Sequence, residues 1–191
     1  MVDLNKLAAE IHEAAVNKGF WSVEDAEEKH LAKMISELGE VVQADRAGIM
    51  YEVEREGAKP EGVVAELADF VMMALDLAVQ KYSIHLLCNA FAKEAQHLPF
   101  YAKERKDCNT PEDLIALYAE VPVYRFVASN AANIHLMVAF VKRDEVYFES
   151  MGSFIHFLSL WCTGNGFDLF DVIRQKMAYN ESRPALHGRK Y

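Results

Sequence analysis

Apolar residues recur along most of the chain at steps of three and four, and only 9 Gly and 5 Pro interrupt them. This spacing puts apolar side chains on one face of a helix and predicts an all-α protein. The first predicted helix begins near Leu4 and ends at Gly19, and the second ends at Gly48, since glycine commonly terminates helices. Ser22 and Asp25 have the spacing of an N-terminal cap for the second helix.

A polar segment separates the second predicted helix from the third. Residues 51–62 contain Gly, Pro and several charged residues, which predicts a loop. A long apolar helix is predicted over residues 63–82, and helical spacing continues over 83–107 after a bend near Ser83.

The second half of the chain has the clearest local signal for a helix start. Thr110 can cap a helix, Pro111 suits its first turn, and Asp113 completes a capping box, while Pro122 ends the segment. Three further helices are predicted over residues 124–141, 145–162 and 167–180, and residues 181–191 form a tail.

Length and charge restrict the class of protein. A chain of 191 residues with 52% hydrophobic and 26% charged residues predicts one globular domain over residues 1–191. Its formal charge of −9 argues against binding a nucleic-acid polymer, although a small basic pocket could still hold a phosphate.

Cysteine usage and hydropathy indicate a cytoplasmic protein. Cys88, Cys108 and Cys162 are far apart and form no CxxC pair, which argues against a disulfide framework and a thiolate zinc site. The first residues lack the basic and apolar runs of a signal peptide, and no apolar stretch reaches the ~20 residues that a membrane span needs. We therefore expect no membrane partner.

Two pairs of acidic residues stand out on predicted apolar helices. Glu37 and Glu40 are three residues apart, so both project from one side of the second helix. Glu66 and Asp69 repeat this spacing on the third. Like charges at 4 Å repel by about 4 kcal/mol at an effective dielectric of about 20, so a positive group should offset them.

Helices joined by one loop commonly pack antiparallel, and the acidic faces of the second and third helices could then meet. Four converging carboxylates would suit a hard divalent cation, Mg²⁺ or Mn²⁺ as its substitute. A cation with open positions could bridge phosphate oxygens and activate a water. The alternative is that each acidic pair lies on a solvated helix face, where such pairs are common.

Glu-x-x-Glu on one helix and Glu-x-x-Asp on the next resemble the signature of the MazG-like, all-α nucleoside triphosphate pyrophosphatases, a superfamily that includes the dimeric dUTPases. The matching segments are "GFWS", "KHLAKMISELGEVVQADR", "VVAELADFVMMALDLA" and "KMAYNESRPALHGRKY". The resemblance implies a helical bundle of that type with additional helices in the middle of the chain, an insertion over about 83–162. It also implies that Mg²⁺ binds Glu37, Glu40, Glu66 and Asp69. Ser36 stands where many members have a further Glu, so Glu37 and Glu40 both remain candidates for orienting the attacking water.

The C-terminal segment adds candidate phosphate ligands. Lys176, Asn180 and Arg183 lie at positions i, i+4 and i+7, on one face of a helix. This spacing resembles the phosphate-binding C-terminal motif of the dimeric dUTPases and of phage-type MazG proteins, which assigns these three residues to phosphate contact. From the residues alone, Lys176 and Arg183 could instead solvate the last helix and favour its C-terminal end through the helix dipole.

Further candidates for substrate contact are weaker. Tyr179, His187 and Lys190 adjoin the phosphate motif and belong to the resemblance. Trp21 could stack on a nucleobase, as aromatic faces do, but an aromatic residue just before a helix is more often a packing staple.

The resemblance implies a Mg²⁺-dependent nucleotide pyrophosphohydrolase, a hydrolase that acts on phosphorus-containing acid anhydrides. Its substrate would be a nucleoside triphosphate, converted with water to the monophosphate and pyrophosphate. The expected role is house-cleaning of the nucleotide pool, and the expected assembly is a homodimer or homotetramer.

A ferritin-like di-iron carboxylate protein is the main alternative. A four-helix protein of that class needs two Glu-x-x-His pairs and one Glu from each remaining helix. The chain offers Glu27/His30 and Glu94/His97, with Glu10 or Glu13 and Glu66 to complete the set. This interpretation leaves Glu37, Glu40 and Asp69 without a role. A third interpretation, a non-catalytic helical module that dimerises through apolar faces, treats both acidic pairs as accidents.

Overall fold

The computed structural model describes residues 2–21, 27–55, 57–81, 84–104, 110–139 and 144–184. These residues form eight α-helices and no strand, which confirms the predicted all-α class. Their bounds are α1 (Leu4–Asn17), α2 (Glu27–Ala47), α3 (Val63–Lys81), α4 (Ile84–Glu104), α5 (Pro111–Ala119), α6 (Val123–Ala139), α7 (Asp144–Gly164) and α8 (Leu169–Ser182).

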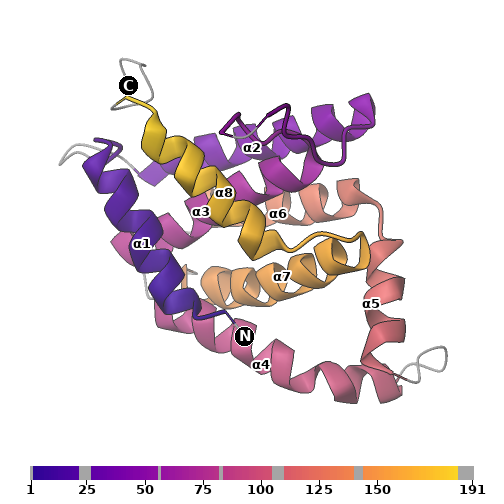
Figure 1. Ribbon diagram of the computed structural model, residues 1–191. Helices are drawn as coiled ribbons and strands as arrows, with labels where there is room; N and C mark the ends of the chain where they lie inside the picture. Colours follow the sequence, from indigo (N-terminus) through magenta and orange to yellow (C-terminus); the bar gives the residue numbers. More distant parts are fainter. Residues whose placement is uncertain are drawn as a thin grey trace.

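Helix α3 lies at the centre of the fold. Most of its residues are buried, as expected of a helix that is apolar on nearly every side. It packs against α1, α2 and α8, and more lightly against α4 and α7. Figure 1 shows α8 crossing the face of the molecule between α1 and α2. Helices from both ends of the sequence, together with the preceding helix α2, therefore pack around the helix that carries Glu66 and Asp69.

The middle of the chain forms a second group of helices. Helix α7 packs extensively against α4 and α5, and α6 packs against α2 (Figure 1). Gly152 permits the close approach of α7 to α4, because a Cβ at this position would lie 2.1 Å from the carbonyl oxygen of Leu87. Trp161 is buried and donates a hydrogen bond to the carbonyl of Val121.

Several predicted helix boundaries are confirmed by the backbone. Thr110 and Asp113 form the reciprocal hydrogen bonds of a capping box, with Pro111 in the first turn. Gly48 has φ of 71° and follows the last residue of α2, so it terminates that helix. The last two helices lie further along the chain than predicted: α7 continues to Gly164, and α8 runs from Leu169 to Ser182. The Asp168 carboxylate accepts hydrogen bonds from the amide nitrogens of Phe170 and Asp171 and so caps α8.

The predicted loop after α2 is a compact turn. Glu52 and Glu61 form an antiparallel bridge, and the amides of Val63 and Val64 donate to the carbonyls of Ile49 and Met50. These contacts hold the start of α3 beside the end of α2. The chain must therefore reverse, and the two acidic helices lie side by side as predicted.

Some predictions fall on residues that lie outside the described ones. They are the Ser22–Asp25 cap, the bend near Ser83, and the candidate contacts His187 and Lys190. Within the described part of the chain, no helix is both long and apolar enough to cross a membrane.

Candidate metal and phosphate site

Three acidic side chains from two helices converge at one end of a cavity. Glu37 and Glu40 lie one turn apart on α2, and Glu66 is in the first turn of α3. One carboxylate oxygen from each lies within 4.8 Å of the other two. Among the described residues, carboxylate, imidazole and thiolate ligand atoms come close enough to share one ion in this group of three.

The electrostatics of this group favour a bound cation. Burial, followed by the nearby charges of Asp69, Glu40 and Glu66, raises the pKa of Glu37 to about 8. Burial also raises the pKa of Glu66, although the ammonium groups of Lys176 and Lys59 lower it. Glu66 is 5% exposed, and its Oε2 atom is buried without a hydrogen-bond partner in the described part of the chain. An oxygen-only set with an unsatisfied buried carboxylate fits a hard divalent cation.

The fourth predicted acid, Asp69, is engaged by a buried lysine. Lys176 Nζ lies 2.6 Å from Asp69 Oδ2 and 3.9 Å from Glu66 Oε2, and it donates to the carbonyl oxygen of Pro60 at 3.2 Å. Lys176 is 2% exposed, so it does not simply solvate the last helix. Part of the positive charge that the acidic pairs require therefore comes from α8.

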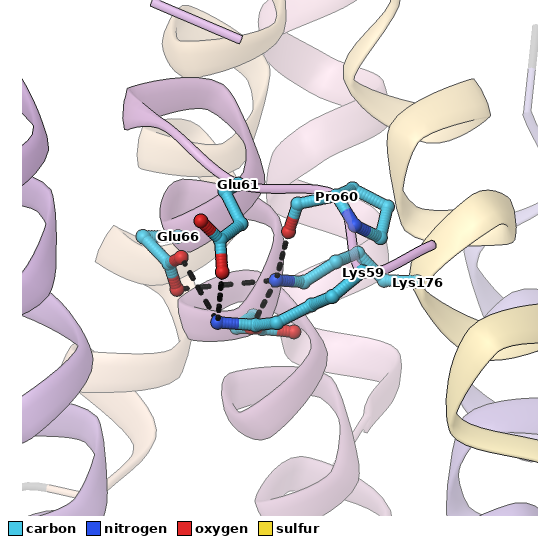
Figure 2. Close-up of polar contacts among 6 residues, drawn as sticks. Lys59, Pro60, Glu61, Glu66 and Lys176 are labelled. Carbon is cyan, nitrogen blue, oxygen red and sulfur yellow. Dashed lines mark hydrogen bonds and ion pairs between the residues drawn. The ribbon is translucent and has the colours of Figure 1, made fainter. Parts of the chain in front are cut away.

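A second lysine approaches Glu66 from the loop between α2 and α3. Lys59 Nζ lies 3.6 Å from Glu66 Oε1 and 3.8 Å from Glu61 Oε1. Figure 2 shows Lys59 and Lys176 reaching the Glu66 carboxylate from separate segments. Two ammonium groups and several carboxylates thus form one connected charge network.

The acidic group opens into a cavity of about 830 Å³, a size typical of small-molecule sites. Helix α8 contributes Lys176, Tyr179, Asn180 and Arg183 to the lining of the same cavity. The guanidinium of Arg183 lies 5.6 Å from the centre of the Tyr179 ring. Positive and amide groups therefore line the same cavity as the candidate cation ligands.

Lys18 fastens the C-terminal end of α8 beside α1. Its ammonium donates to the carbonyl oxygens of Glu181 and Arg183, and its side chain also lines the cavity. Carbonyls in the last turn of a helix lack intrahelical partners, and Lys18 supplies one. This contact fixes the position of the candidate phosphate ligands on α8.

The surroundings of Trp21 favour the packing interpretation over contact with a nucleobase. Its indole Nε1 donates to both oxygens of Asp76 at 2.9 Å, and its ring stacks on His30 with centroids 3.8 Å apart. His12 Nδ1 also lies 2.7 Å from Asp76 Oδ1. Asp76 and His30 line the cavity, while Trp21 is not among its lining residues. Trp21 thus packs against two residues of the cavity lining without belonging to that lining.

The structure therefore brings most of the predicted site into one cavity. The lining residues among those predicted are Glu37, Glu40, Glu66, Asp69, Lys176, Tyr179, Asn180 and Arg183. Sequence reasoning missed Lys59, Lys18 and Asp76. Lys59 lies in an irregular loop, where no periodicity indicates the direction in which its side chain points. Asp76 had a usable signal, since it is an acid seven residues after Asp69 on the same helix.

The described residues of the alternative di-iron set do not form a comparable group. His30 stacks on Trp21, and Glu94 accepts a hydrogen bond from Ser153. Of the described side chains, neither these nor His97 belong to a cluster with metal-ligand spacing. The side chain of Glu27 lies outside the described ones. This geometry gives the di-iron interpretation no support.

Comparisons of the chain with protein-family models, with curated proteins and with solved structures found no match.

Proposed function

We propose that the protein is a MazG-like, Mg²⁺-dependent nucleoside triphosphate pyrophosphohydrolase. The reaction is hydrolysis of a (d)NTP at the α–β anhydride to the monophosphate and pyrophosphate. On this proposal, the helices between residues 83 and 162 are an insertion into the MazG-like bundle. The biological setting would be cleansing of the nucleotide pool by a homodimer or homotetramer.

One observation carries this proposal. Glu37, Glu40 and Glu66 converge at one side of a cavity of about 830 Å³, and α8 presents Lys176, Asn180 and Arg183 to the same space. A triphosphate held by a cation needs hydrogen-bond donors for its remaining oxygens. An ammonium, an amide and a guanidinium fork supply such donors.

The residues of the acidic group fit a divalent cation, and Glu37, Glu40 and Glu66 would hold it with Asp69 adjacent. Bound Mg²⁺ would supply charge neutralisation for the phosphate oxygens. Glu37 or Glu40 would position the attacking water and accept its proton, while Arg183 and Lys176 would stabilise charge on the phosphates. Positioning and electrostatic stabilisation of this kind account for most phosphoryl-transfer catalysis.

The proposal is tested by pyrophosphate release from a panel of NTPs and dNTPs, including modified bases. We expect release with Mg²⁺ and none with EDTA, because the cation joins the carboxylates to the triphosphate. Glu37→Gln and Glu66→Gln should each abolish release, since each removes a ligand charge while keeping the side-chain shape.

Glu28→Gln is the matched control, because Glu28 lies on the same helix as Glu37 but is exposed and outside the cavity. Its activity should equal that of the wild type, and circular dichroism should show all variants folded. No release from any member of the panel by folded protein, or full turnover in both site variants, would contradict the proposal.

A further inference from the structure

Lys59 differs from the other lysine in the charge network in how firmly it is held. Its ammonium lies 3.6 Å from Glu66 and 3.8 Å from Glu61, distances longer than an ordinary charge-assisted hydrogen bond. Its side chain is 38% exposed and belongs to the loop before α3. Neither ion pair has the length of a close hydrogen bond, and the lysine end is in contact with solvent, so these pairs hold the Lys59 side chain only loosely.

Lys176 is fixed by comparison. It is 2% exposed, lies 2.6 Å from Asp69 Oδ2, and donates to the carbonyl of Pro60, the residue that follows Lys59 (Figure 2). If the ammonium of Lys176 moved away, Asp69 and the buried Glu66 would lose this counter-ion. Of the two ammonium groups at Glu66, Lys59 is therefore the one that is free to change partners.

Lys59 and a divalent cation would compete for the same carboxylate. Glu66 belongs to the group of three acids with metal-ligand spacing, and Lys59 contacts its Oε1 atom. A cation on Glu66 weakens the attraction between that carboxylate and the lysine. Lys59 also lines the cavity that a triphosphate would fill.

We propose that Lys59 is a phosphate-binding residue of this cavity, and that it exchanges Glu66 for phosphate oxygens when a divalent cation binds the acidic group. The inference rests on the proposed function and adds a residue to its substrate site. It predicts opposite effects of Lys59 on two affinities, that for the cation alone and that for a polyphosphate. Lys59 opposes binding of the cation alone, because both are positive, and it favours binding of a polyphosphate, because its ammonium donates to anionic oxygens.

The test measures these two equilibria separately with Lys59→Met. Isothermal titration with Mn²⁺ alone should show binding about threefold tighter than in the wild type, because one opposing charge is lost. Titration with inorganic tripolyphosphate at saturating Mg²⁺ should show binding about tenfold weaker, the loss of one charge-assisted contact. Neither readout depends on turnover.

Two further variants control for folding and for net charge. Lys59→Arg keeps the positive charge and should keep both affinities near wild type. Lys81→Met makes the same charge change at the exposed far end of α3, about 22 Å from Glu66 along the helix at 1.5 Å per residue. It should alter neither affinity.

The possible results separate this inference from the function on which it rests. If the wild type binds both probes and Lys59→Met binds them with the same affinities, the role of Lys59 is overturned and the pyrophosphohydrolase proposal still stands. Weaker binding of both probes in Lys59→Met would also overturn it, since that pattern indicates structural support. A folded wild type that binds neither probe would overturn both proposals.

Discussion

The contacts of Lys176 in the structure differ from both roles that the sequence predicts for it. Its position on the last helix predicted either a phosphate ligand or a solvated charge. The structure instead buries its ammonium against Asp69 and Glu66 while keeping it on the cavity wall. The positive group required by the acidic pairs is thus partly internal. Helix spacing could not reveal this, because burial depends on what packs over α8.

The ionisation of Glu37 should make the free energy of unfolding depend on pH. Its pKa is about 8 in the folded protein and near 4.5 without burial. Between these values the folded state binds a proton that the unfolded state does not, so stability falls as pH rises and levels off above about 8. Urea unfolding in EDTA at pH 5.5, 7.0 and 8.5 should show this loss in the wild type.

Glu37→Gln is the reference for this pH dependence, since it removes the titrating group and keeps its shape. The stability of the wild type relative to this variant should fall from pH 5.5 to pH 8.5. A constant difference between the two proteins over this range would mean that the pKa of Glu37 is not raised.

At the scale of elements, the loop between α2 and α3 decides whether the acids meet. Gly62 has φ of 101°, and a Cβ there would lie 2.9 Å from the carbonyl oxygens of Ile49 and Met50. Those carbonyls accept the first hydrogen bonds of α3. The loop was predictable from its glycines and proline, but its compact form and the direction of Lys59 depend on these backbone contacts.

Gly62→Ala should therefore destabilise the protein by about 2 kcal/mol or more, because it combines left-handed backbone with a clash against carbonyl oxygens. Gly57→Ala is the matched control in the same loop. Its φ is 77° with no atom within 4 Å of an added Cβ, so it should lose only about 1 kcal/mol from backbone strain. Urea unfolding measures both, and equal losses would show that the close approach at Gly62 is easily relieved.

At the scale of the whole molecule, α8 closes the fold over α3. It carries residues from the end of the chain to acids that lie more than a hundred positions earlier, as the ion pair between Lys176 and Asp69 shows. Figure 1 shows this helix lying across the molecule beside α1, and it packs on α3. The stability of the entire helical assembly should therefore depend on this pair, in which the lysine is buried.

Lys176→Met should lower the free energy of unfolding by about 3 kcal/mol, because it removes a buried ammonium that contacts both Asp69 and the buried Glu66. Arg174→Met on the same helix is the control: its guanidinium is 57% exposed and lies 4.0 Å from Glu10, so its loss should cost less than about 1 kcal/mol. Adding Asp69→Asn to Lys176→Met should restore part of the stability. Equal destabilisation by the Lys176 and Arg174 variants in urea unfolding would contradict this account.

The sequence by itself determined the helical class, most helix boundaries and the two acidic pairs. These follow from local rules: apolar periodicity, the Thr110 capping box and the terminating glycine at Gly48. Only the tertiary structure decided which charges meet, because contacts such as Lys18 with α8 and Lys59 with Glu66 join segments whose relative direction no local pattern encodes. Burial likewise belongs to the assembled fold, and burial is what raises the pKa of Glu37 and makes Lys176 an internal counter-ion.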